Sequence, residues 1–515
     1  MISEKNATIW YNKNCNMKKQ AITHNIIGAF SNFAFLFLTS IVLLPYYFKF
    51  VSATDYGIWL GGISFLSLVS VLEANISLIL TQLLGEKWTN KKADEFSKYF
   101  TAALFFGIAI SCLIVIFTYF IKDSLCNWVS NEKQINKIIS DSFFYYSIYL
   151  SLTIISGYVN SISQVLLKTL LPPIFNIIAS IFGILYTFWA IPSQGILAIA
   201  TGNVVKAFIY SSMVTIYAFI ILRKANIPII FEFRYLSKLM RNIGLPFISK
   251  VGMTLAVSIQ NFIIATTISA TATTIFDITK KLPSIAQMLI NMVAVSTFTS
   301  FSLYYSEQKN KKDKHEYTDH YFSLIRIILL FSLAGIFIIG QDFITFWVGI
   351  DKFGGNILLA LLCICALSDQ LRMILSQQYY AIGKFNLTSL TDTIFAITFM
   401  IIALFLIPIF GLKGIVLAGI FANTVYFGIC FYLEKKYNID MIKHIINRSL
   451  FFDLLIILFA SAIVKFIYES YRGNLFVGVS TIFIAIVILV TTFYIKEKSL
   501  FNFLILKFGK TSKSR

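Results

Sequence analysis

Long apolar stretches separated by short polar ones run along most of the chain. Runs of about 20 mostly apolar residues recur between residues 21 and 495, and this is the length at which an α-helix crosses the hydrocarbon core of a bilayer. Membrane-spanning strands are shorter and alternate between apolar and polar positions, so the pattern predicts helices. We expect fourteen spanning helices, at about residues 21–48, 56–84, 99–121, 142–167, 173–192, 196–222, 244–270, 274–304, 321–348, 355–382, 387–410, 414–432, 451–470 and 475–495.

The composition agrees with an all-α polytopic membrane protein that has little soluble mass. Of the 515 residues, 57% are hydrophobic and 13% are charged, and the mean hydropathy is +0.78. Soluble domains are about 25% charged. The predicted outer loops are no longer than about 20 residues. We therefore expect no catalytic domain outside the membrane.

The formal net charge of +19 suggests a nucleic-acid partner at first sight, but the positions of the charges point elsewhere. With the N-terminus on the cytoplasmic side, about 29 lysines and arginines fall on that side and about seven on the outer side. Cytoplasmic loops of membrane proteins carry such an excess of positive charge. The distribution predicts that both termini are cytoplasmic, and it makes a nucleic-acid partner unnecessary.

The two halves of the chain echo each other. "NIIGAFSNF" begins the first predicted helix at Asn25 and "NIGLPFISK" begins the seventh at Asn242, and later helices keep a similar offset of about 217 residues. Six helices separate the copies, so the repeats are parallel. We predict an N-lobe of helices 1–6 (1–222), a C-lobe of helices 7–12 (223–450), and helices 13–14 with a basic cytoplasmic tail (451–515). Substrates of such proteins bind between the lobes, which alternate access by rocking.

Polar residues form stripes on several of the predicted helices. On the eighth helix, Asp277, Lys280, Ser284, Gln287 and Asn291 follow one another at spacings of three and four residues, so they share one face. A charge at the bilayer centre costs about 2.5–3.5 kcal/mol. We therefore expect the stripes to face protein or a wet cavity. Other helices carry Glu73 on the second, Lys206 on the sixth, Lys250 and Asn261 on the seventh, and Asp369 and Arg372 on the tenth.

Cations outnumber anions in the predicted membrane segments by six to four. One reading is structural, in which Asp369 pairs with Arg372 and Asp277 pairs with a lysine such as Lys281 four residues away. This reading fits Lys280 less well. The natural partner of a cationic excess is an anion from outside, such as a phosphate or diphosphate. The candidate substrate-binding residues are Lys250, Lys280, Lys206, Lys281, Arg372, Gln287, Asn291 and Asn261.

Two stretches and the helix plan connect the chain to a known family. "LLPYYFKFVSATDYGIW" (43–59) joins the first two predicted helices, and "FDITKKLPS" (276–284) lies at the start of the eighth. With these stretches, its fourteen helices and its two lobes, the chain resembles the O-antigen and polysaccharide-unit flippases of the multidrug/oligosaccharidyl-lipid/polysaccharide exporter superfamily. The resemblance covers about residues 20–495.

The resemblance implies a cationic lumen lined by helices 1, 2, 7 and 8. It also implies that an undecaprenyl-diphosphate-linked oligosaccharide crosses the bacterial inner membrane from the inner to the outer leaflet, for the synthesis of O-antigen, lipopolysaccharide or another surface polysaccharide. A polysaccharide polymerase and chain-length regulator proteins are the partners expected beside membrane lipids, and no cofactor or metal is expected. Glu73, Lys250 and Lys280 lie on three of the four lining helices, whereas Lys206 lies on none of them.

The mechanism that follows is alternating access, with the diphosphate and the glycan in the wet cavity and the polyprenyl tail in lipid. Lys250, about 10 Å from the cytoplasmic end by helical rise, meets the phosphate early, and Lys280 meets it late. Glu73, Asp277 and Asp369 are the candidates for coupling to a proton or sodium gradient, or else for ion pairs with the lysines.

Two other classes of function compete with this hypothesis. A drug or cation antiporter of the same superfamily favours a lumen of net negative charge, which the lysines oppose. A polytopic glycan polymerase or a related enzyme calls for a large outer loop with paired acidic or basic residues at the sugar. The longest outer loop, 122–141, has charges but no Asp-x-Asp pair, so we expect a transporter and no enzyme.

Overall fold

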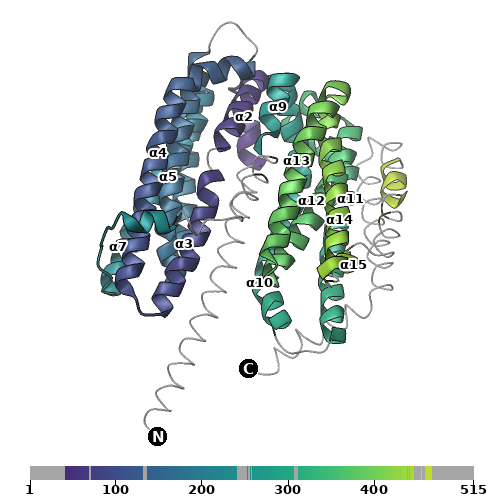
Figure 1. The fold of residues 1–515 in the computed structure, drawn as a ribbon. Helices are drawn as coiled ribbons and strands as arrows, with labels where there is room; N and C mark the ends of the chain where they lie inside the picture. The colour runs from purple at the N-terminus through teal and green to yellow at the C-terminus, as the bar shows by residue number, and fades with distance from the viewer. Residues whose placement is uncertain are drawn as a thin grey trace, which may run out of the picture. The chain divides into compact units, whose positions relative to one another are not determined.

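The computed structural model confirms an all-α protein (Figure 1). Eight helices of the described part are long and apolar enough to cross a membrane. Together with the composition, they establish a multi-pass membrane protein. The structure describes residues 41–68, 71–130, 136–239, 252, 256, 258–306, 311–437, 439, 441–445, 454, 457 and 459–466.

The chain divides into two compact units. The first unit comprises residues 1–277 and 389–415, and the second comprises 278–388 and 416–515. Helices α10 (Ala270–Ser306), α13 (Phe385–Phe410) and α14 (Leu412–Tyr437) run through a boundary between the units. The first unit also contains α2 (Ala53–Ser67), α3 (Val71–Thr89), α4 (Ala93–Ser130), α5 (Lys137–Val165), α6 (Leu171–Gln194), α7 (Ile196–Lys224) and α9 (Gln260–Thr267). The second also contains α11 (Lys311–Val348), the 3₁₀-helix η1 (Ile350–Lys352), α12 (Asn356–Ala381) and α15 (Ile442–Ile445).

These two units are defined by the contacts within each of them, and their bounds differ from those of the predicted lobes. The two six-helix lobes and the appended helix pair stay a prediction. Most of the predicted spans match a helix to within a few residues, although α4 and α11 extend well beyond their predicted spans. The predicted helix at 475–495 lies outside the described residues, and those at 21–48, 244–270 and 451–470 are described only in part.

The second predicted helix, 56–84, was wrong as a single element. Helix α2 ends at Ser67, where Leu68 is its C-cap, and α3 begins at Val71. The Ser67 hydroxyl donates to the carbonyl of Ile63 at 2.7 Å. Serine hydroxyls that bond the backbone in this way compete with the helical ladder, which favours an end here.

Helices α4, α5 and α7 form the core of the first unit. Small residues bring α4 and α5 together. The hydroxyl of Ser111 donates to the Ser151 carbonyl at 3.1 Å, and the hydroxyl of Ser151 donates to the Ser111 carbonyl at 3.0 Å. Gly107 lies against the ring of Tyr158, where a side chain would collide with it. Helices of membrane proteins pack through small residues, which let their backbones approach, and through hydroxyls that are hydrogen-bonded across the interface.

In the second unit, the buried carboxylate of Glu434 joins three elements. It accepts hydrogen bonds from the Tyr379 hydroxyl of α12 at 2.7 Å, and from the backbone amides of Met441 at 3.2 Å and Ile442 at 3.0 Å. A buried carboxylate is tolerated when donors surround it in this way. Glu434 thereby fixes the first turn of α15 beside the end of α14.

Candidate substrate pathway

The polar stripe of α10 faces α12 along part of its length. Gln287 donates from Nε2 to the carbonyl of Ala366 at 3.1 Å. Two turns of α12 are involved, because Gln370 donates from Nε2 to Oδ1 of Asn291 at 2.9 Å. These two contacts confirm that Gln287 and Asn291 face protein. Their role in binding a substrate stays a prediction.

A group of charged and polar side chains lies beside this stripe, between α12 and α14. Arg372 has 2% of its surface exposed, and its Nε donates to Oδ1 of Asn423 at 2.9 Å. Its guanidinium also lies 3.5 Å from Oδ1 of Asp369, whose side chain is 31% exposed. Asn423 donates to the same carboxylate oxygen at 2.9 Å. The local ion pair that the sequence allowed for Asp369 and Arg372 is therefore confirmed.

Lys280 of α10 belongs to the same region of the second unit. Cys365 lies 3.6 Å from Oδ2 of Asp369, and it is within electrostatic range of Lys280, Asp369 and Arg372. We call Lys280, Asp369 and Arg372 the charge cluster. It contains two basic side chains and one carboxylate, and lysine and arginine are side chains that bind phosphates in proteins.

Asp369→Ala is expected to destabilise the protein, because it leaves the buried Arg372 guanidinium with less compensation. Breaking one partner of a fully buried pair costs about 3–5 kcal/mol, and the partial exposure of Asp369 reduces the expected loss to about 2 kcal/mol. Thermal unfolding in detergent measures the effect. Ser368→Ala, next to it in sequence, removes one neutral acceptor of Asn423 and should cost less than about 1 kcal/mol. Equal falls in Tm for the two variants would contradict the assignment.

In the first unit, α2 packs closely against α9 and the first turns of α10. The hydroxyls of Thr54 and Thr271 are hydrogen-bonded at 3.1 Å, and the Thr274 hydroxyl donates to the Ala53 carbonyl at 2.6 Å. A Cβ on Gly57 would overlap the carbonyl oxygen of Ala270. We call this contact the α2–α10 seal. It lies at the end of these helices that the charge distribution assigns to the outer side.

One helical turn further along α2, the approach is equally close. A Cβ on Gly61 would lie 2.8 Å from Cβ of Ala265 in α9 and 2.6 Å from a methyl of Val129 in α4. Gly57 and Gly61 thus form a small-residue motif of the kind that lets membrane helices approach closely. The space between α2 and the α9–α10 segment is closed here.

The remaining candidate residues lie on α3, α7, α9 and α10, or outside the described residues. Lys206 is half-buried on α7, its Cβ packs toward Gly183 of α6, and in the described part of the chain its ammonium has no hydrogen bond or ion pair. Asn261 is half-buried on α9, and Asp277 and Lys281 are half-buried on α10. Glu73 lies on α3 with its side chain outside the description, and Lys250 falls outside the described residues.

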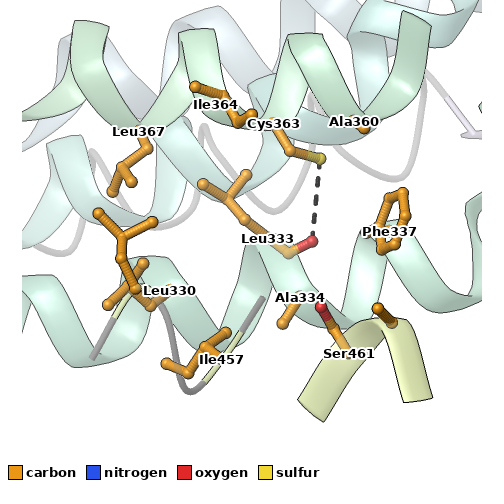
Figure 2. A pocket seen from close by; sticks show the side chains of 12 residues that line it. Leu330, Leu333, Ala334, Phe337, Ala360, Cys363, Ile364, Leu367, Ile457 and Ser461 are labelled. Atoms are coloured by element: carbon orange, nitrogen blue, oxygen red, sulfur yellow. Dashed lines mark hydrogen bonds between the residues drawn. The ribbon is translucent and has the colours of Figure 1, made fainter. Parts of the chain in front are cut away.

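An apolar cavity of about 190 Å³ lies in the second unit (Figure 2). Figure 2 shows the Cys363 thiol beside the Leu333 carbonyl, 3.8 Å away, and Ser461 on the segment below. Since the lining is almost wholly hydrocarbon, the cavity suits an alkyl or isoprenoid chain and no headgroup. It is lined by Leu330, Leu333, Ala334, Phe337, Ala360, Cys363, Ile364, Leu367, Leu454, Ile457, Ser461 and Ala462.

No protein-family model and no curated protein sequence matches the chain. Among solved structures it is similar to the lipid II flippase MurJ in an inward closed conformation, with a TM-score of 0.69 and 16% identity over 95% of this chain and 99% of that chain. The chain therefore shares the fold of this flippase.

Multidrug MATE transporters share this fold at lower similarity. An inward-facing MATE transporter of the superfamily gives a TM-score of 0.58 at 16% identity, over 76% of this chain and 94% of that chain. A mutant form of the Vibrio cholerae MATE transporter VcmN gives 0.57 at 10% identity, over 82% of this chain and 97% of that chain. These likenesses establish the fold of the chain, and its substrate is a separate question.

Several residues of the pathway were missed by the sequence-based prediction. Asn423 and Cys365 complete the surroundings of Asp369, and Gly57, Ala270 and Thr274 build the seal. The spacing of Gly57 and Gly61 was a signal for close helix packing. Nothing in the sequence pattern pointed to Asn423, because its partners lie on another helix.

Proposed function

We propose that the chain flips a polyprenyl-diphosphate-linked oligosaccharide between the leaflets of the bacterial inner membrane, for O-antigen or another surface polysaccharide. The charge cluster is the observation that supports this proposal most. Arg372 pairs with Asp369, and Lys280 and Asp369 both lie within electrostatic range of Cys365. Lysine and arginine bind phosphate groups and repel a cationic drug.

The described side chains suggest how the cargo is divided between environments. The diphosphate would meet Lys280, and the amides of Gln287 and Asn291 would hydrogen-bond the sugar hydroxyls. These amides already hold α12, so binding would exchange existing bonds for new ones. The isoprenoid tail would stay in lipid, and the apolar cavity of the second unit could take part of it.

The α2–α10 seal supplies one closed gate of an alternating-access cycle. While Thr54 and Thr271 remain in contact, cargo cannot leave between α2 and α10. Release requires these helices to separate, and each hydrogen bond broken costs about 1 kcal/mol net. Glu73 and Asp277 stay the candidates for coupling to a proton or sodium gradient, because the carboxylate of Asp369 already accepts from Arg372 and Asn423.

A drug antiporter is the second candidate function, because solved MATE transporters share the fold. The first of these is a multidrug resistance transporter. A cationic substrate would need a lumen of net negative charge. The charge cluster opposes this candidate. We expect partner proteins such as a polysaccharide polymerase and a chain-length regulator for a flippase and not for a drug antiporter.

Reconstitution into liposomes tests the proposal. Purified protein should move a fluorescent polyprenyl-diphosphate glycan from one leaflet to the other, as measured by loss of fluorescence to a reductant that cannot cross the membrane. Protein-free liposomes give the background rate. Movement of a cationic dye in place of the glycan would favour the antiporter, and no movement of the glycan above background would remove the flippase.

A further inference from the structure

The segment that follows α7, residues 225–239, lies along the start of α4. The backbone of Ile230 is held at both polar groups: its amide donates to the Ser97 hydroxyl at 2.8 Å, and its carbonyl accepts from the Thr101 hydroxyl at 2.6 Å. Beside it, Glu232 pairs with Lys98 at 2.7 Å. These bonds hold Ile230 and Glu232 against α4.

Within residues 229–233, the odd-numbered residues are large, apolar and exposed. Ile229, Phe231 and Phe233 are 61%, 50% and 67% exposed. The ring of Phe231 lies 5.3 Å from that of Phe105 on α4, which is itself exposed. We call Phe105, Ile229, Phe231 and Phe233 the linker face. It continues the exposed apolar surface of α4, a membrane-spanning helix, so it reaches the edge of the bilayer.

Positive charge surrounds the linker face. The ends of α3, α5 and α7, the start of α4 and residues 225–239 carry nine basic and four acidic residues. Three of the acids, Glu86, Glu95 and Glu232, already pair with lysines. The hydrogen bond from Lys98 lowers the pKa of Glu232, so this carboxylate is ionised at neutral pH and neutralises Lys98. Six other cations make no ion pair among the described residues, although Arg234 and Lys238 lie within electrostatic range of Glu232. These cations are Lys91, Lys168, Arg223, Lys224, Arg234 and Lys238.

From this arrangement we infer that the linker face and its cations bind anionic phospholipid in the leaflet next to them. Apolar side chains at the interface insert among acyl chains, and nearby lysines and arginines attract acidic headgroups. Arg234 and Lys238 follow the face directly in sequence, and both are exposed. Lys238 is held 4.3 Å above the ring of Tyr235, which orders its charge. The segment between the predicted lobes is thus anchored to the membrane surface.

Quenching by brominated lipid tests this inference with the full-length protein. Phe233→Trp places a reporter on the face, and its emission is compared with the unmodified chain in phosphatidylcholine vesicles that contain brominated phosphatidylglycerol or brominated phosphatidylcholine. We expect stronger quenching by phosphatidylglycerol. Arg234→Gln with Lys238→Gln should lower this preference roughly fivefold per cation, which corresponds to ~1 kcal/mol each.

A matched pair of substitutions controls for charge alone. Lys137→Gln with Lys413→Gln removes two exposed cations from the first turns of α5 and α14, and it should leave the preference unchanged. Equal quenching by the two lipids would overturn the proposal, because the face would then contact lipid without selecting charge. No quenching by either lipid would also overturn it, and would indicate that protein covers the face.

Discussion

Replacing Gly57 by valine is expected to keep the α2–α10 seal from forming and to slow transport strongly. A side chain at this position would overlap the backbone carbonyl of Ala270, which cannot rotate away as a side chain could. Overpacking of this kind costs about 1–3 kcal/mol, so the population of the sealed state should fall by roughly 10- to 100-fold.

Cross-linking measures the seal directly. The hydroxyls of Thr54 and Thr271 are 3.1 Å apart, so cysteines at both positions should form a disulfide while the seal is closed. Gly57→Val should greatly reduce the yield of this disulfide. Gly85→Val on α3 is the matched control, because no atom lies within 4 Å of a Cβ at Gly85. An unchanged yield in Gly57→Val, or an equal fall in Gly85→Val, would contradict the role of Gly57.

Lys280→Ala is expected to slow movement of a diphosphate-linked cargo by about tenfold or more, because a hydrogen bond to a charged group contributes about 1.5–3 kcal/mol. Lys280→Arg keeps the charge at the same place, so it should retain much of the activity. Transport rates in liposomes give the comparison. Lys384→Ala removes an exposed lysine outside the charge cluster and should transport normally. If Lys280→Ala matched Lys384→Ala, the lysine would have no part in transport.

The stripe on α10 could be predicted from the sequence because helical spacing is a local property. Gln287 and Asn291 lie on the face that their spacing gives them, and both contact α12. The same local reasoning anticipated the pair of Asp369 and Arg372, which are three residues apart on one helix. Within an element, sequence spacing decides which side chains meet.

Contacts between distant segments could not be predicted in the same way. Arg372 also meets Asn423, 51 residues away on α14, and Thr274 meets Ala53 across 221 residues. Such pairs depend on how helices pack, and a periodic pattern carries no information about that. The end of α2 at Ser67 was missed for a different reason, since the apolar pattern continues without interruption past it.

The measurement that tests the central claim most directly compares two cargoes in liposomes that contain the unmodified protein. One is a fluorescent glycan joined to a polyprenyl chain through a diphosphate, and the other has the same glycan and chain joined by an uncharged linkage. Binding of the phosphates by Lys280 and Arg372 predicts rapid movement of the diphosphate cargo and slow movement of the uncharged one. Equal rates for the two cargoes would contradict the claim that the charge cluster selects a negatively charged headgroup.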